Sequence, residues 1–310
     1  MEELNLNLIP AAPEGFCSGF VGIVGRPNVG KSTLMNYLVG QKIAITSPIA
    51  QTTRNRLRGI LTTPTAQIIF VDTPGIHKPH HELGRVLVQN AQMAISSVDA
   101  TLFVVDGTGA AGRGDRFIVE LLKRSQTPVI LGINKIDQQA EEADAINQSY
   151  AAIAAEHQWP LHQFSALTGA GMDSLQDLLT QQLEPGPYYY PPDLVTDQPE
   201  RFIMGELIRE QILAHTREEV PHSVAISIDR VEEEETITRV LATVHVERSS
   251  QKGILIGKGG SMMKTIGTAA RQQIQKLIAG KVYLELFVKV QPKWRQSRTR
   301  LADLGYQIEE

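Results

Sequence analysis

The chain has 310 residues, of which 42% are hydrophobic and 21% are charged, and this ordinary composition argues against extensive disorder. Its length predicts about two domains. The single cysteine, Cys17, excludes a scaffold held together by internal disulfides. No apolar run is long enough to cross a bilayer, and Glu2 and Glu3 stand where a secretion signal would carry positive charge. We therefore expect a soluble cytoplasmic protein.

The net charge of −4 hides a strong segregation along the chain. Counting Lys and Arg against Asp and Glu gives −5 for residues 1–196, −7 for residues 197–247 and +8 for residues 248–310. A binding partner meets the local field rather than the average one. The basic carboxy-terminal segment therefore fits either a polyanion site or a solvated helix face.

The amino-terminal part divides into an extension and an α/β domain. Residues 1–17 contain Pro10 and Pro13 and show little periodicity, which predicts a flexible extension. In residues 18–184, apolar runs alternate with amphipathic stretches, a pattern that predicts a mostly parallel sheet with helices on both faces. The expected strands are Phe20–Val24, Ala66–Asp72, Ala100–Asp106, Pro128–Asn134 and Leu161–Ser165, and the expected helices are Ser32–Val39, Gly84–Ser96, Asp115–Arg124 and Glu141–Glu156.

A proline-rich stretch, residues 185–199, separates this domain from the rest of the chain. Proline fixes φ and removes a backbone donor, so we interpret the stretch as a linker. Residues 200–310 then predict a second, α+β domain. Its elements are a helix from Phe202, a hairpin around Val224–Val246, two helical segments flanking Gly257–Gly260, and a strand from Val282 to Val290. The predicted order is α-β-β-α-α-β.

The segment from Gly25 to Ser32 fits the phosphate-loop pattern G-x-x-x-x-G-K-[ST], and it lies between a predicted strand and a predicted helix, as that motif requires. Backbone N–H groups of such a loop surround phosphate oxygens, and the helix amino terminus adds partial positive charge. Lys31 is expected to reach the β- and γ-phosphates, and the Ser32 hydroxyl to coordinate Mg²⁺. The nucleotide-binding residues predicted here are Gly25, Asn28, Val29, Gly30, Lys31, Ser32 and Thr33.

Three further motifs follow predicted strands. Asp72 is placed to hold Mg²⁺, and the Gly75 N–H to sense a γ-phosphate. In Asn134-Lys135-Ile136-Asp137, a carboxylate can accept the N1–H and the amine of guanine, a donor pair that adenine does not offer. The third motif is the tripeptide Ser165-Ala166-Leu167, whose backbone N–H groups would bind guanine O6. Together these motifs predict a guanine-nucleotide site that includes Asn134, Lys135, Asp137, Ser165, Ala166 and Leu167.

In its motif order, residues 20–183 resemble a GTPase of the translation-factor-related class. In that class a switch segment carries a threonine that ligates Mg²⁺ in the triphosphate state. The resemblance places this segment at Ser47–Arg58 and points to Thr53, with Thr52 as the alternative. The expected metal ligands are thus Ser32, Thr53 and Asp72.

Ile76 stands where many such GTPases carry the glutamine that orients the attacking water. No catalytic base is therefore assigned, and we expect slow intrinsic hydrolysis with Lys31, Thr53 and Gly75 contacting the γ-phosphate. Related GTPases with a hydrophobic residue there can use K⁺, and Asn28 is the matching residue. The residues His77, His80 and His81 are interpreted as solvated loop side chains.

Gly257-Lys258-Gly259-Gly260 fits a G-x-x-G turn between two helical segments, and basic side chains flank it. Such glycines allow a nucleic-acid backbone to approach closely, lysines neutralise phosphates, and an apolar groove accepts unstacked bases. The arrangement resembles a type II KH domain, although the same fold could serve packing alone. The predicted RNA-binding residues are Arg248, Lys252, Gly257, Lys258, Gly259, Gly260, Lys264 and Arg271.

The two halves together resemble the Era GTPase family over residues 18–310. The family-like segments are Glu247–Gly260 and Val288–Arg295. The resemblance implies a monomeric GTP/GDP-binding factor that binds 16S rRNA near its 3′ end, assists assembly of the 30S subunit and associates loosely with the inner membrane.

Two other functions can be weighed against the residues. The first is a GTPase whose partner is a protein or a membrane surface, with the carboxy-terminal domain as a docking module. The second is an ATPase, with which the Asn134–Asp137 motif conflicts.

Overall fold

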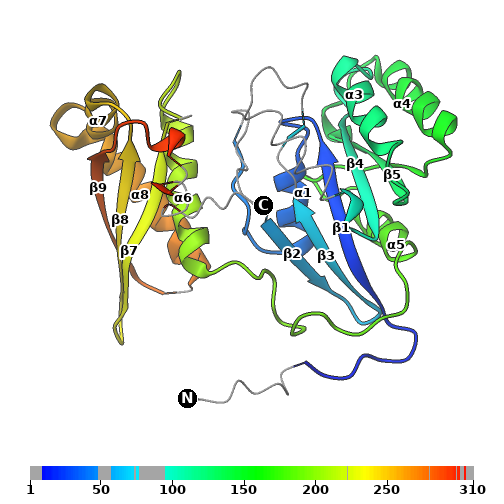
Figure 1. Cartoon of the computed structure of the whole chain (residues 1–310), viewed down its shortest axis with the longest axis horizontal. Helices are drawn as coiled ribbons and strands as arrows, with labels where there is room; N and C mark the ends of the chain where they lie inside the picture. The colour runs from blue at the N-terminus through cyan, green and yellow to red at the C-terminus, as the bar shows by residue number, and fades with distance from the viewer. Residues whose placement is uncertain are drawn as a thin grey trace. The chain divides into compact units, whose positions relative to one another are not determined.

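The computed structural model describes residues 9–47, 57–72, 75–76, 95–221, 223–278, 280–297, 299–300 and 304. These residues fall into two compact units (Figure 1). Unit 1 lies within Met1–Ala44 and Thr53–Asp197, and unit 2 within Ile45–Thr52 and Gln198–Glu310.

Unit 1 is built on a sheet with the strand order β2-β3-β1-β4-β5-β6. Strand β2 is antiparallel to β3, and the other neighbours are parallel. Strand β3 is buried at every residue, which requires cover on both faces of the sheet. The strands are β1 (Cys17–Gly25), β2 (Leu57–Thr62), β3 (Ala66–Asp72), β4 (Ala100–Asp106), β5 (Val129–Asn134) and β6 (Leu161–Gln163).

The described helices of unit 1 are α1 (Lys31–Val39), α3 (Arg113–Leu122), α4 (Ala143–His157) and α5 (Met172–Thr180). Helices α3 and α4 share one hydrophobic cluster with β1, β4 and β5, in which Phe103, Leu131 and Tyr150 are fully buried. Helices α1 and α5 both pack against β1. The predicted parallel α/β sheet with helices on both faces is confirmed.

The parallel strands bring the motif-bearing connections to one edge of this sheet. Gly25, Asp72, Asp106 and Asn134 each end a strand, and parallel strands present their carboxyl ends at the same edge. The connections that leave this edge carry the sequence motifs described above. Their spatial convergence is therefore a consequence of the topology.

Residues of the predicted extension and of the predicted linker make defined contacts within unit 1. Phe16 is buried, and its ring lies 4.4 Å from that of Tyr188, measured between centroids. The buried Gln67 side chain accepts hydrogen bonds from the N–H groups of Tyr189 and Tyr190 and donates to the Tyr190 carbonyl. An aromatic contact and the hydrogen bonds of Gln67 thus hold part of the proline-rich stretch on unit 1, and the division between the two units falls after Asp197.

Unit 2 has the element order α-β-β-α-α-β. Its sheet has the order β7-β8-β9, with β7 antiparallel and β9 parallel to β8. Helix α6 packs against α8 and β7, and α7 packs against α8 and β9. The elements are α6 (Glu200–His215), β7 (Ala225–Glu233), β8 (Thr238–Val246), α7 (Ser249–Ile256), α8 (Ser261–Leu277) and β9 (Val282–Val290).

The core of unit 2 follows from the alternation in β8, where Val240, Ala242, Val244 and Val246 are fully buried. The buried Trp294 closes one end of the unit and donates its indole N–H to the Ser223 carbonyl at 3.1 Å. Within the described residues, none of the helices has the length and apolar character needed to span a membrane.

Candidate functional site

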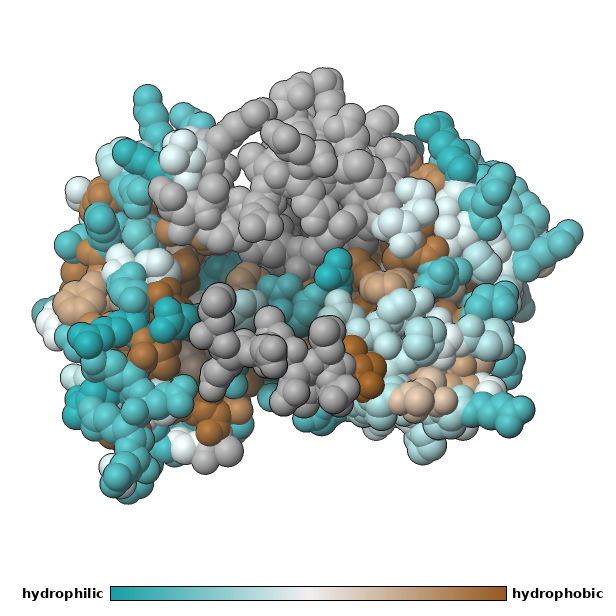
Figure 2. Space-filling model, turned by 60° about the horizontal axis from the view of Figure 1, so that its bottom comes forward, coloured by the Kyte–Doolittle hydropathy of each residue, from teal (hydrophilic) through white to brown (hydrophobic). Residues whose placement is uncertain are grey.

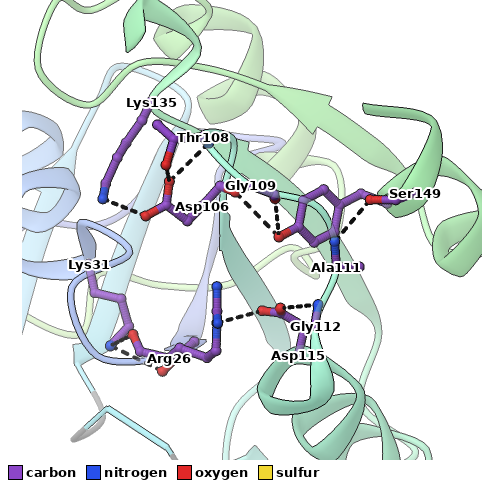
Figure 3. Close-up of polar contacts among 12 residues, drawn as sticks. Arg26, Lys31, Asp106, Thr108, Gly109, Ala111, Gly112, Asp115, Lys135 and Ser149 are labelled. Carbon is purple, nitrogen blue, oxygen red and sulfur yellow. Dashed lines mark hydrogen bonds and ion pairs between the residues drawn. The ribbon is translucent and has the colours of Figure 1, made fainter. Parts of the chain in front are cut away.

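The connection between β1 and α1 forms a phosphate-loop conformation around Lys31. The Lys31 ammonium is buried and donates to the carbonyls of Gly25 at 3.2 Å and Arg26 at 3.0 Å (Figure 3). Asn28 and Gly30 adopt positive φ values of 65° and 100°, which turn the chain sharply before the helix. Burial lowers the pKa of Lys31, and the nearby Asp72 carboxylate opposes this shift.

The Asn134 side chain connects three of the predicted motifs. Its amide donates to the Val29 carbonyl at 2.8 Å and accepts the Ala166 N–H at 2.9 Å. Asn134 is 2% exposed, and a side chain on Gly30 would place Cβ 2.3 Å from its amide nitrogen. The structure therefore brings the phosphate loop, the Asn134–Asp137 motif and the tripeptide Ser165–Leu167 together.

Lys135 pairs with an acid that the sequence motifs do not include. Its ammonium lies 2.6 Å from Asp106 at the end of β4, and Thr108 donates to the same carboxylate (Figure 3). Burial raises the pKa of Asp106, but the hydrogen bonds from Lys135 and Thr108 outweigh this effect and hold the pKa below its usual value. The position of Asp106 at a parallel strand end is the sequence signal that could have identified it.

Asp72 and Gly75 lie beside the phosphate loop. Asp72 is fully buried at the end of β3, and a Cβ on Gly75 would lie 2.9 Å from Pro27. Ile76 is buried in the α3–α4 cluster, and its N–H donates to the Gly25 carbonyl. An apolar, buried side chain at this position supplies neither an acid nor a base.

The remaining predicted nucleotide residues occupy the same edge with different exposure. Ser32 and Thr33 are half-buried in the first turn of α1, and Asp137 is exposed in the 3-10 turn Ile136–Gln138. Ser165 is buried, whereas Leu167 is 69% exposed. Thr52, Thr53, His77, His80 and His81 lie outside the described residues. In the part of the chain that is described, His, Cys, Asp and Glu side chains form no group of three that could hold a metal.

Unit 2 contains a groove of about 640 Å³ between α7, α8 and β9. Four predicted RNA-binding residues line it, namely Lys252, Gly260, Lys264 and Arg271. The groove also contains apolar and aromatic groups from α7, α8 and β9 that the sequence analysis did not name, and Phe287 among them is 51% exposed. These groups are Ile256, Met263, Tyr283, Leu284, Leu286, Phe287 and Val288. Figure 2 shows hydrophobic residues, in brown, scattered between hydrophilic ones, in teal, on the described part of this face.

The glycine-rich turn beside this groove is open. Gly257, Gly259 and Gly260 have positive φ values of 71°, 60° and 82°. A Cβ on Gly257 would lie 2.7 Å from Met262 Cβ, so this position requires glycine. Cβ atoms on Gly259 and Gly260 would meet nothing within 4 Å, which leaves their backbone accessible. The exposed side chains of Arg248 and Lys258 flank the groove without lining it.

Two protein-family models match the chain. The model described as a 50S ribosome-binding GTPase matches residues 20–135, and a KH domain model matches residues 219–295.

The curated relatives include full-length matches. GTPase Era of Nostoc sp. is 76% identical over 97% of this chain and 93% of its own length. GTPase Era of Rippkaea orientalis is 70% identical over 100% of this chain and 98% of its own length.

Two solved structures have the same architecture over 94% of this chain and 99% of their own chains, with a TM-score of 0.88 and 38% identity. One is Era in complex with MgGDPNP and nucleotides 1506–1542 of 16S ribosomal RNA. The other is a single-substitution variant of Aquifex aeolicus Era bound to GDP·AlF4⁻.

Proposed function

The chain belongs to the Era family of GTPases, and from this premise we propose that it binds 16S rRNA near its 3′ end and assists assembly of the 30S subunit. It is a GTPase with a phosphate-loop domain followed by a KH domain. The proposal concerns the RNA target and the assembly role.

The nucleotide half of the proposal rests on the convergence of motifs around Asn134. The buried Lys31 ammonium supplies positive charge for phosphates, and the exposed Asp137 carboxylate supplies the acceptor for guanine. The donor set beside Lys31 suits Mg²⁺, because a buried carboxylate and a hydroxyl are oxygen ligands. Ser32 and Asp72 would hold the ion together with nucleotide phosphates, and it would neutralise negative charge there. Thr53 remains the proposed third protein ligand.

The observation that carries the RNA half is the groove in unit 2. Its basic side chains can neutralise phosphates, its apolar side chains can accept bases, and the open turn at Gly259 and Gly260 lets a sugar-phosphate backbone approach. The exposed Phe287 ring on β9 lines the groove and offers a stacking surface, whereas the Tyr283 ring already has the Arg239 guanidinium 5.4 Å from its centroid. An Era structure with 38% identity contains a segment of 16S rRNA, which supports that RNA as the target.

The experiment replaces Gly259 and Gly260 by aspartate in the full-length chain. Two negative charges at the open turn should lower affinity for a single-stranded RNA of the 16S 3′ sequence by at least about tenfold. Hydrolysis measured without RNA should stay at the unmutated rate. Gly15→Asp is the matched control, because Gly15 has a φ of 75° and equal open space in unit 1. Unchanged RNA affinity in the Gly259/Gly260 variant would favour a docking module over an RNA site.

Several finer properties remain proposals on the family premise. They are slow intrinsic hydrolysis, a contribution of K⁺ near Asn28, a monomeric state and loose association with the inner membrane. Burial of Ile76 supports slow hydrolysis, because no titratable side chain occupies that position. Hydrolysis rates in matched KCl and NaCl buffers test the K⁺ contribution.

A further inference from the structure

Arg26 occupies a variable position of the phosphate-loop pattern, yet its side chain has a defined partner. Its Nε lies 2.9 Å from Asp115 Oδ1 in the first turn of α3 (Figure 3). The Arg26 side chain is 36% exposed, whereas that of Asp115 is fully buried. Burial of a carboxylate is costly unless it is paired, and Arg26 supplies the charge partner of Asp115 as an ion pair without hydrogen-bond geometry.

Asp115 is a rigid anchor because it is held on its other side as well. Its Oδ2 accepts the Gly112 N–H at 2.9 Å, which caps the amino terminus of α3. The helix is fixed in turn by Ile118 and Leu122, which are buried in the α3–α4 cluster. The carboxylate therefore has a position set by the core of unit 1.

Gly114 supplies an independent indication that this part of α3 is shaped around Arg26. A Cβ on Gly114 would lie 2.6 Å from the Arg26 Cδ. Gly114 lies within α3, where glycine is less favourable than alanine. It has no positive φ, so the conformational freedom of glycine does not explain its presence there. The space left by the missing side chain is filled by the Arg26 stem.

The main chain of Arg26 contacts Lys31. The Arg26 carbonyl accepts a hydrogen bond from the Lys31 ammonium at 3.0 Å, so Arg26 lies between that ammonium and the Asp115 anchor. We propose that Asp115 is a positioning residue of the GTPase site. Acting through Arg26, it holds the phosphate loop in the geometry that receives phosphate groups. Preorganisation of this kind raises affinity because the ligand does not have to order the loop.

The test measures GDP affinity by titration of a fluorescent GDP and thermal unfolding without nucleotide, both on the full-length chain. Asp115→Asn retains an acceptor for Gly112 but removes the charge facing Arg26. We expect Asp115→Asn and Arg26→Gln each to weaken GDP binding by about tenfold, and the double variant to be no weaker than either single one. Arg26→Lys, which can keep the ion pair, should recover most of the affinity.

Gly114→Ala separates positioning from stability. Alanine favours the helix, which offsets part of the cost of displacing the Arg26 stem from the buried Asp115, so the unfolding midpoint should fall less than in Arg26→Gln while GDP binding weakens to a similar extent. Glu120→Gln is the matched control, because Glu120 forms an exposed pair with Lys123 on the same helix, at 3.0 Å. Its GDP affinity should match that of the unmutated chain.

The ratio of GDP to inosine diphosphate affinity provides a further readout. Because the Arg26–Asp115 pair acts on the phosphate side, both affinities should fall by the same factor in Asp115→Asn and the ratio should stay constant. Three results would overturn the proposal: GDP affinity within twofold of the unmutated chain in Arg26→Gln or Gly114→Ala, additive losses in the double variant, or a changed nucleotide ratio.

Discussion

Replacement of Asn134 by alanine tests whether one buried amide holds the nucleotide edge of unit 1 together. The side chain donates to Val29 and accepts from Ala166, and these partners lie 105 and 32 residues away in the sequence. Alanine removes both hydrogen bonds, so the Val29 carbonyl and the Ala166 N–H lose this partner. We therefore expect lower stability of unit 1 and weaker binding of guanine nucleotides.

The magnitude follows from the two lost contacts. A net hydrogen bond contributes about 0.5–1.5 kcal/mol, and a buried group left unsatisfied costs about 1–3 kcal/mol. Asn134 is 2% exposed, so water compensates little at the site. We expect the free energy of unfolding of unit 1 to fall by about 2–3 kcal/mol.

The assay uses tryptophan fluorescence in a urea titration without nucleotide. The chain has two tryptophans, and Trp159 packs edge-on against Phe103 in unit 1 with centroids 6.4 Å apart. In a Trp294→Phe background, Trp159 becomes the reporter of unit 1. Asn147→Ala is the matched control, because the half-buried Asn147 side chain accepts one hydrogen bond from Gln139 at 2.8 Å.

The control should lose less than about 1 kcal/mol of unfolding free energy. If the free energy of unfolding of Asn134→Ala lies within about 0.5 kcal/mol of that of the unmutated chain, the substitution behaves like an ordinary surface substitution. That result would refute the view that this amide connects the three motifs.

Three further predictions concern the two sites and one buried histidine. Lys31→Ala should lower GTP affinity by at least about tenfold, because a buried ammonium beside the phosphates is lost; equal affinity in a nucleotide titration would contradict the loop assignment. Asp137→Asn should move base preference from guanine toward xanthine with an unchanged unfolding curve, as measured by competition between GDP and xanthosine diphosphate. Burial lowers the pKa of His245, although its hydrogen bond with Gln291 opposes the shift. The stability of unit 2 should therefore be full above the ordinary histidine pKa of about 6.5 and decline as pH falls through the lower folded-state value. Unfolding followed by Trp294 fluorescence should show this decline, and His245→Gln should flatten it; an equal slope in both proteins would exclude His245 as its source.

The strand bounds predicted from the sequence were most accurate where a strand is buried along its whole length. The strands Ala66–Asp72 and Ala100–Asp106 have the predicted bounds, because each is an apolar run that ends at an aspartate. Strand β2 was missed, since it is antiparallel and contains Arg58 and Gly59, which interrupt an apolar run. The predicted switch segment Ser47–Arg58 accordingly ends inside this strand.

Helical segments with little amphipathic pattern were harder to predict. Helix α7 was predicted only as a helical segment before Gly257, without its start at Ser249. The capping contacts that start it, from the N–H groups of Glu247 and Arg248 to the Gln251 side chain, depend on side-chain geometry. Helix α5 was also missed, although Met172, Leu175 and Leu179 are buried in it at helical spacing.

Site prediction had a similar limit. The motifs supplied the predicted nucleotide-binding residues, because a phosphate loop is defined by its residue spacing between a strand and a helix. The supporting contacts, such as Lys135 with Asp106 and Arg26 with Asp115, join residues from separate connections. In unit 2, the parallel register of β8 and β9 brings Tyr283 and Phe287 to the groove, and that register has no local signature.

The affinity of the full-length chain for an RNA with the 16S 3′ sequence, against a scrambled RNA of equal length, tests the central claim most directly. The measurement is made at fixed salt with GDP and with a non-hydrolysable GTP analogue, because phosphate contacts make affinity salt-dependent. The account predicts tighter binding of the 16S sequence by at least about tenfold in one nucleotide state. Equal binding of both RNAs in both states would contradict it.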